Sequence, residues 1–194
     1  MAHDYLIVNA ETVTTEPKCG MAPTQEELYR EASATYGAAL QRLAAGYEAD
    51  SDRRRDLLQE IHLSLWQSLA SYDARCSLRT WAYRIAHNVA TTHVIREQRR
   101  NSRTLIGLEG VEAARNPDEP ERALDERNAL QKLLRLIHRL KPLDRQVILS
   151  YLEEMDAVSI AEITGISPGN VATKIHRIKN VLAHQFQEGE THAE

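Results

Sequence analysis

The stretch "SIAEITGISPGNVATKIHRIKN", residues 159–180, predicts two short helices that meet across a tight turn. Ser159 and Glu162 match the capping-box pattern, in which a hydroxyl and a carboxylate satisfy free backbone N–H groups at a helix start. Gly165 can adopt the left-handed conformation that follows a helix, and Ser167-Pro168 pairs an N-cap with a proline at the first helical position. Together these signals predict a helix-turn-helix.

The second of these helices has a face that suits DNA. A helix that reads duplex DNA must fit the major groove, present short polar side chains near its N-terminus and carry cations for phosphates. No acid falls between Asn170 and His184. A capped amphipathic helix can equally be the last helix of a bundle, so this motif alone leaves both interpretations open. The candidate DNA contacts are Ser167, Pro168, Asn170, Thr173, Lys174 and Arg177.

Upstream of this motif the sequence is also helical. Thr24 and Glu27 form a capping-box pattern that predicts the start of a first helix, and residues 56–69 have the apolar spacing of a second. A third helix follows in "SLRTWAYRIAHNVATTHVIREQRR", residues 77–100, which has one apolar face and one polar, cationic face. Helical periodicity resumes near Leu130 and halts briefly at Pro142. No stretch alternates as a strand would, so the fold class is predicted to be all-α.

The charges are sorted along the chain. The chain has 194 residues, with 24 Lys and Arg against 28 Asp and Glu, so its total charge predicts no nucleic-acid partner. Yet residues 75–103 contain seven arginines and one acid, whereas residues 109–127 contain seven acids and three arginines. The acidic part lies in a stretch with two glycines and two prolines, which is typical of a linker.

These patterns predict two small helical domains joined by an acidic linker, the C-terminal one containing the helix-turn-helix. Segments with weak periodicity lie at both ends of the chain. The predicted division is a mobile leader at 1–23, an N-terminal domain at 24–103, the linker at 104–126, a C-terminal domain at 127–186 and a tail at 187–194.

Several function classes lack their usual motifs. The two cysteines lie far apart without metal-ligand spacing, which indicates neither a disulfide framework nor a zinc site and suits a reducing cytoplasm. The apolar run "YLIV" is too short for a signal peptide or a membrane span. There are eight histidines but no HExxH, no phosphate-binding glycine loop and no GxSxG. We therefore expect a cytoplasmic, non-enzymatic protein without membrane insertion, cofactor or metal.

The whole pattern resembles the extracytoplasmic-function (ECF) group of the sigma-70 family, the small bacterial sigma factors that give RNA polymerase its promoter specificity. The resemblance runs from residue 25 to 185 and rests on motifs that occur in register. These are "DLLQEIHLSLW", "SLRTWAYRIAHNVATTH" with its basic tail, the acidic linker, and "LKPLDRQVILSYLEEMDAVSIAEITGISPGNVATKIHRIK".

The resemblance implies a sigma factor that binds core RNA polymerase and directs promoter-specific transcription initiation. Its N-terminal, region 2-like domain would bind polymerase and melt the minus-ten promoter element, holding it as single-stranded DNA. Its C-terminal, region 4-like domain would read the minus-thirty-five element as duplex. Many members of the family are held inactive by an anti-sigma factor, so such a partner is open here too, although no residue identifies one.

Two sets of interface residues come from this resemblance. The "DLxQE" helix of the family packs on a coiled coil of the largest polymerase subunit, which assigns Asp56, Leu57, Gln59 and Glu60 to that contact. The loop "SYDARCS" and the next helix correspond to the part that captures a flipped base and the non-template strand. The implied minus-ten contacts are Asp73, Arg75, Ser77, Asn88, Thr92, Arg96, Arg99 and Arg100.

Some alternatives stay open at this level. Asn88 is the first candidate for the base pocket but could instead satisfy a neighbouring backbone group. Trp81 is predicted to be in the core, while Tyr72 and Tyr83 could stack on unpaired bases. The acidic linker suits either a basic polymerase channel or a solvated tether.

The sequence also departs from the family in places. Ala172 stands where many members have a cation and Asn170 where threonine is common, so minus-thirty-five preference does not transfer. "RRR" at 53–55 replaces a more acidic lead-in. A stand-alone helix-turn-helix repressor or activator is the alternative function, but it would leave "DLLQE" and the basic helix unexplained.

Overall fold

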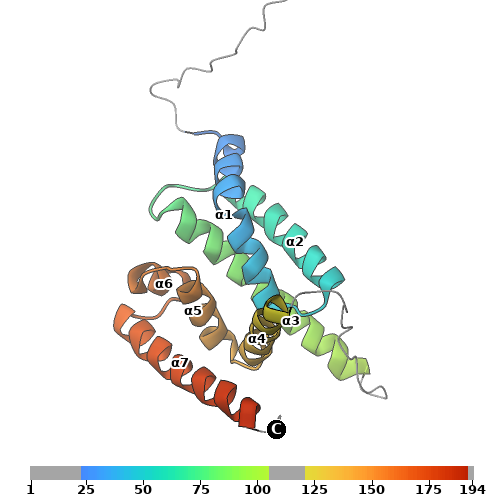
Figure 1. Ribbon diagram of the computed structural model, residues 1–194. Helices are drawn as coiled ribbons and strands as arrows, with labels where there is room; N and C mark the ends of the chain where they lie inside the picture. Colours follow the sequence, from blue (N-terminus) through green and yellow to red (C-terminus); the bar gives the residue numbers. More distant parts are fainter. Residues whose placement is uncertain (1–22, 105–120, 192–194) are drawn as a thin grey trace, which may run out of the picture.

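The computed structural model describes residues 23–104 and 121–191, which form seven α-helices and no strand (Figure 1). The predicted all-α class is therefore confirmed. The leader up to residue 22, with Cys19, lies outside the described residues, as do residues 105–120 of the predicted linker and the last three residues. The helices are α1 (Gln25–Tyr47), α2 (Ser51–Leu69), α3 (Leu78–Thr104), α4 (Glu121–His138), α5 (Pro142–Leu152), α6 (Ala157–Thr164) and α7 (Pro168–Thr191).

Helices α1, α2 and α3 pack against one another around an aliphatic core. The start of α1 is the predicted capping box: Thr24 Oγ1 accepts from the Glu27 N–H at 3.2 Å, and Glu27 Oε2 accepts from the Thr24 N–H at 2.8 Å. Burying each large aliphatic side chain contributes about 1.5–3 kcal/mol, so these residues dominate the domain's stability. The fully buried members include Leu40, Leu57, Ile61 and Leu65.

Helix α2 begins earlier than the sequence pattern predicted. It starts at Ser51, not Asp56, because Asp50 caps it by accepting from the Asp52 and Arg53 N–H groups at 3.1 and 2.9 Å. The apolar periodicity starts only at Leu57, so periodicity alone missed the polar first turn. The cap determines where the helix starts.

The predicted linker at 104–126 was too long at its C-terminal end. Helix α4 begins at Glu121, directly after Pro120, and so includes the last six residues assigned to the linker. The boundary differs because helical structure extends into a stretch whose acidic composition suggested a linker.

The helix-turn-helix is present as α6 and α7. Gly165 follows α6 with φ of +75°, and Ser167 Oγ accepts from the Asn170 N–H at 3.3 Å at the start of α7. The predicted capping box at Ser159 and Glu162 was wrong. Asp156 caps α6 instead, accepting from the Val158 and Ser159 N–H groups at 2.9 and 2.8 Å, because a carboxylate directly before the helix reaches both donors.

The turn between α4 and α5 is closed by Arg145. Its guanidinium is buried and donates to the carbonyls of Ile137 at 3.2 Å, Leu140 at 3.4 Å and His138. The Ile137 and His138 carbonyls belong to the last turn of α4 and the Leu140 carbonyl follows it, so the guanidinium supplies donors to acceptors at the end of this helix. The Arg145 guanidinium also lies 5.4 Å from the centre of the Tyr47 ring, so it links this turn to α1.

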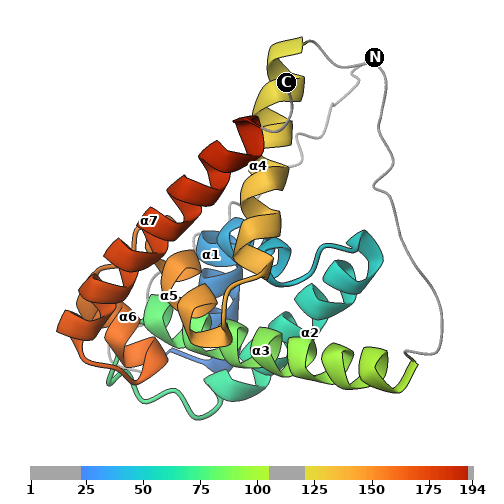
Figure 2. The same ribbon diagram turned by 90° about the horizontal axis from the view of Figure 1, so that it is seen from below.

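The C-terminal helices pack directly on the N-terminal ones (Figure 2). Helix α3 is contacted by α5 and α6, and helix α1 is contacted by α4 and α5. Helix α7 lies on the outer side of the C-terminal helices. The close approach of α1 to α5 depends on Gly46, since a Cβ at this position would lie 2.5 Å from Leu149 Cδ2. The boundary also contains a buried imidazole. His87 Nδ1 lies 2.9 Å from Tyr47 Oη, and His87 Nε2 lies 2.9 Å from Ser150 Oγ on α5.

This imidazole predicts acid sensitivity. Burial lowers the pKa of His87 from 6.5 to about 3, because the charged form would lose its hydration. A lowered folded-state pKa means that stability is fully present above pH 6.5 and is lost as the pH falls toward 3. Over that window each pH unit should cost about 1.4 kcal/mol of unfolding free energy from this group.

The variant His87→Gln stays neutral and can still hydrogen-bond. It should therefore flatten the pH dependence of the unfolding free energy, measured by urea titrations followed by circular dichroism. A residual slope from other groups is expected, since burial also lowers the pKa of His62 and His138. Equal pH slopes in the two proteins would contradict the assignment.

Candidate nucleic-acid and protein interfaces

The outward face of α2 carries the first set of predicted interface residues. Asp56 and Gln59 are exposed and Glu60 is half-buried, so all three are available along this helix. Leu57 is different: it is fully buried in the core and supports the helix without presenting a surface. The burial of Leu57 therefore contradicts its prediction as a contact residue.

Two apolar residues extend this face, and sequence reasoning missed them. Leu63 and Trp66 are 58% and 37% exposed, and they follow Gln59 at intervals of four and three residues along α2. Only part of the Trp66 ring is covered, where it packs edge-on to Tyr29 at 5.4 Å between ring centres. Exposed large apolar groups beside polar ones are typical of a protein contact surface. Their exposure could not be read from spacing alone.

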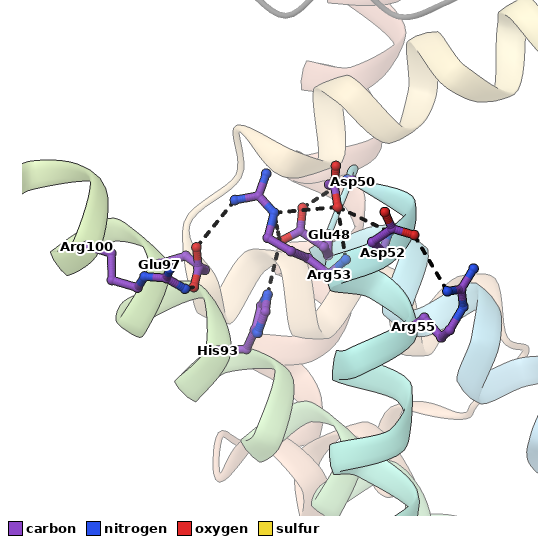
Figure 3. A network of polar contacts seen from close by, with 8 residues as sticks. All are labelled: Glu48, Asp50, Asp52, Arg53, Arg55, His93, Glu97 and Arg100. Carbon is purple, nitrogen blue, oxygen red and sulfur yellow. Dashed lines mark hydrogen bonds and ion pairs between the residues drawn. The ribbon is translucent and has the colours of Figure 1, made fainter. Parts of the chain in front are cut away.

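The "RRR" segment forms part of an internal charge network (Figure 3). Arg53 lies 3.8, 3.7 and 3.3 Å from carboxylate oxygens of Glu48, Asp50 and Glu97, so it joins the start of α2 to α3. Glu48 also lies 3.0 Å from His93 Nε2. The departure from the family's acidic lead-in thus has a structural role, because Arg53 neutralises carboxylates of its own domain.

The loop before α3 holds three of the predicted minus-ten residues. Asp73 and Arg75 are exposed and pair with each other at 2.8 Å, while Ala74 between them has φ of +58°. Ser77 has a local task, since its Oγ accepts from the Thr80 N–H at 3.0 Å and caps α3. Its hydroxyl is therefore engaged by the protein itself.

The polar face of α3 is exposed, as its spacing predicted. Asn88, Thr92 and Arg96 lie one turn apart in succession, and Arg99 and Arg100 follow on the exposed end of the helix. The Asn88 backbone carbonyl accepts from Thr92 Oγ1 at 2.9 Å, and Arg96 lies 3.4 Å from Glu60 on α2. Arg100 pairs with Glu97 at 2.9 Å. The structure thus brings these five residues together on one surface.

The aromatic residues near this surface are not all placed as predicted. Tyr83 is only 1% exposed, because the C-terminal domain covers it, so it cannot stack on a base in this arrangement. Burial raises its pKa to about 12. Trp81 is half-buried and donates from Nε1 to Ser68 Oγ at 3.0 Å, as a core residue would. Tyr72 packs edge-on to Trp81 and donates to the Cys76 carbonyl at 2.8 Å.

The second helix of the helix-turn-helix presents fewer free cations than its sequence predicted. Asn170 and Thr173 are exposed, as are Ser167 and Pro168. Lys174 Nζ, however, lies 2.6 Å from Asp144 Oδ1, and Arg177 Nη2 lies 2.9 Å from Asp144 Oδ2. Sequence reasoning missed Asp144, because no pattern pairs residues so far apart along the chain.

The described residues offer no metal site and no membrane span. Among residues 23–104 and 121–191, no three His, Cys, Asp or Glu side chains come together as a metal site would require. Over the same ranges, no helix is long and apolar enough to cross a membrane. The described surfaces present one mixed polar and apolar face on α2, one cationic face on α3 and one polar face on α7.

Both domains have counterparts in known proteins. Residues 33–100 match the family Sigma-70 region 2, and residues 130–182 match Sigma-70, region 4. The chain is 28% identical to the ECF RNA polymerase sigma factor SigW of Bacillus subtilis over 69% of this chain and 75% of that protein. It is 30% identical to the RNA polymerase sigma factor YlaC of the same organism, over 64% of this chain and 72% of that one.

Two solved structures share the fold. The sigma factor RpoE, solved with the anti-sigma factor NepR from Bartonella quintana, superposes with a TM-score of 0.64 at 19% identity, covering 82% of this chain and 96% of that one. CnrH, solved with the cytosolic domain of CnrY, gives a TM-score of 0.60 at 18% identity, covering 85% and 90%.

The charge network of Figure 3 predicts unequal roles for two neighbouring arginines. Arg53→Ala should lower the unfolding free energy by about 1 kcal/mol, because it removes the cation between three carboxylates. Arg55→Ala is the matched control, since Arg55 makes one exposed pair with Asp52 at 3.6 Å and should cost less than about 0.5 kcal/mol. Urea denaturation of both variants measures the difference, and equal losses would argue against the network.

Proposed function

The chain belongs to the ECF group of the sigma-70 family, and from this membership we propose how its two domains divide the work of a sigma factor in transcription initiation. We assign core-polymerase binding and minus-ten melting to the N-terminal helices, and minus-thirty-five recognition to the C-terminal ones. The partners are then core RNA polymerase and promoter DNA inside the cell, and the protein acts by binding without catalysis. The presence of region 2 and region 4 in one chain carries this proposal.

The polymerase surface is assigned to the outward face of α2. Asp56 and Gln59 supply exposed polar groups, and Leu63 and Trp66 supply exposed apolar area beside them. Interfaces commonly combine a few large apolar anchors with a polar rim. This mixture favours a protein contact over a purely solvated face.

The minus-ten surface is assigned to α3 and the loop before it. Asn88 and Thr92 are exposed polar groups that can hydrogen-bond to an unstacked base, and the arginines at 96, 99 and 100 can bind the backbone. Asp73 and Arg75 lie exposed in the loop before the helix. Single-stranded DNA binding needs both kinds of group, which supports the assignment.

The minus-thirty-five surface is assigned to the N-terminal half of α7. Asn170 and Thr173 are exposed polar side chains on the helix that a helix-turn-helix inserts into the major groove. Ser167 and Pro168 lie at its start, where the free backbone N–H groups of a helix favour phosphate. Lys174 and Arg177 add cations on the same helix.

A regulatory partner belongs to the proposal as well. RpoE was solved in complex with an anti-sigma factor, and CnrH with the cytosolic domain of CnrY. We extend the expectation of an anti-sigma factor to this chain. A stand-alone repressor or activator would use α6 and α7 but gives no role to the region 2 match.

Reconstituted transcription tests the proposed function. Core RNA polymerase, this protein and fragmented host DNA should give discrete RNA start sites that share two spaced upstream motifs and that vanish without the protein. If no start sites appear and the protein binds duplex DNA tightly without polymerase, the stand-alone regulator replaces the sigma factor.

The assignment of the polymerase surface to α2 leads to a prediction for a single residue. Asp56→Arg should weaken co-elution with core polymerase in gel filtration at least several-fold, because it reverses an exposed charge at the assigned interface. Glu31→Arg is the control, an equal charge reversal on the exposed side of α1. Unchanged binding by Asp56→Arg, or equal loss in both variants, would remove this face from the interface.

A further inference from the structure

Asp144 bridges two cations of the proposed recognition helix. It lies in the first turn of α5, is buried, and uses one oxygen for Lys174 at 2.6 Å and the other for Arg177 at 2.9 Å. Both carboxylate oxygens are therefore occupied by side chains of α7. The Lys174 side chain is 25% exposed and that of Arg177 is 61% exposed, so Lys174 is the more tightly enclosed of the two.

This pairing changes what the recognition helix offers to DNA. Unpaired cations bind any phosphate backbone, and each such contact adds roughly 0.9 to the slope of log affinity against log salt. Asp144 cancels part of the charge of Lys174 and Arg177 and holds both side chains against α5. Asn170 and Thr173, which can hydrogen-bond to base edges, remain exposed.

We propose that Asp144 is a positioning residue that restrains Lys174 and Arg177, so that duplex binding by α7 depends on base contacts more than on phosphate attraction. This proposal rests on the proposed minus-thirty-five function. The proposed effect of Asp144 is on selectivity. Because its carboxylate weakens all phosphate contacts equally, the sequence-specific contacts to base edges decide which DNA site is bound.

The test compares holoenzymes carrying the wild-type protein, Asp144→Asn or Asp144→Glu. Each binds two duplex promoter fragments, one intact and one with a scrambled upstream element, over a series of salt concentrations. Asp144→Asn should raise affinity for the scrambled fragment several-fold, lower the ratio of intact to scrambled binding, and steepen the salt slope by roughly 1 to 2. Asp144→Glu keeps the charge and should resemble the wild type.

A purely structural role for Asp144 would change melting without changing the salt slope. The double variant Asp144→Asn with Arg177→Gln should return the slope toward the wild-type value, since it removes the released cation. An unchanged slope and ratio in a folded Asp144→Asn holoenzyme overturns the proposal. If the wild-type holoenzyme itself ignores scrambling, the proposed function of α7 fails instead.

A separate set of contacts joins the two domains through α3. The Glu153 carboxylate accepts two hydrogen bonds from Arg42 on α1, at 2.6 and 2.7 Å, and one from Tyr83 at 3.3 Å. The Glu153 carbonyl accepts from Arg79, and the Glu162 carbonyl accepts from Arg84 at 3.0 Å. The C-terminal domain thus engages two arginines of α3 through its backbone.

One of these arginines, Arg84, lies beside the proposed minus-ten surface. Arg84 precedes Asn88 by one turn on the same face of α3, and Asn88 is followed by Thr92 and Arg96. While the domains are packed, the hydrogen bond of Arg84 to the Glu162 carbonyl competes with bonds to DNA phosphates. Helices α5 and α6 also lie directly against α3 (Figure 2).

We infer that the packed arrangement is an autoinhibited state, in which the Glu162 carbonyl of the C-terminal domain competes with single-stranded DNA for Arg84 at the edge of the exposed face of α3. This second inference also rests on the proposed minus-ten function. The Arg42–Glu153 pair is the contact chosen for the test, because it borders an open cavity of about 680 Å³ that leaves room for altered side chains. Neither residue belongs to an assigned DNA or polymerase surface.

A charge exchange tests the autoinhibited state in the full-length protein. Arg42→Glu and Glu153→Arg should each open the domains, increasing the radius of gyration in small-angle X-ray scattering. Both should bind a fluorescent single-stranded oligonucleotide of random sequence several-fold more tightly. The double variant restores the pair and should return both measurements toward the wild type.

The two single variants also control for charge. They change net charge in opposite directions, so simple attraction to DNA would move their affinities apart, whereas opening moves them together. Opposite shifts, or opening without tighter binding, overturn the inference. Failure of the proposed function would appear separately, as absent promoter-specific transcription by the wild-type holoenzyme.

Discussion

The close packing of α3 against α1, α2 and the C-terminal domain is the constraint on which the rest of the structure depends. Ala82, Ala86 and Ala90 are fully buried, and such small side chains allow neighbouring helices to approach closely. With Tyr83 and His87 also buried, only a limited part of this helix can face solvent. The row from Asn88 to Arg96 belongs to that part and is continued by Arg99 and Arg100, so these exposed residues of α3 form one surface.

Charge pairing is how a protein with a formal net charge of −4 accommodates the cations of its proposed DNA surfaces. Arg53 and Arg96 contact carboxylates within the N-terminal domain, and Lys174 and Arg177 share Asp144 in the other. Ion pairs on an exposed surface contribute little to stability, typically less than about 1 kcal/mol. Their larger effect is on DNA binding, because a phosphate group must compete with the carboxylate for the paired cation.

Local signals in the sequence succeeded where the interacting groups are neighbours along the chain. The Thr24 and Glu27 capping box, the left-handed Gly165 and the proline at the start of α7 were all predicted, since each depends on residues within one turn. The errors arose where two local signals competed. Ser159 matched a capping motif, yet Asp156 lay better placed to cap α6. The acidic residues after Pro120 matched both a linker and a helix start.

The sequence by itself determined the helical class, the helix-turn-helix and the family, because these follow from periodicity, caps and motifs that are read along the chain. Only the tertiary structure decided which side chains remain available. It buried Leu57 and Tyr83, exposed Leu63 and Trp66, and paired the cations of α7 with Asp144. The physical reason is that exposure and charge pairing depend on which helices meet, and contacts between distant segments leave no local pattern in the sequence.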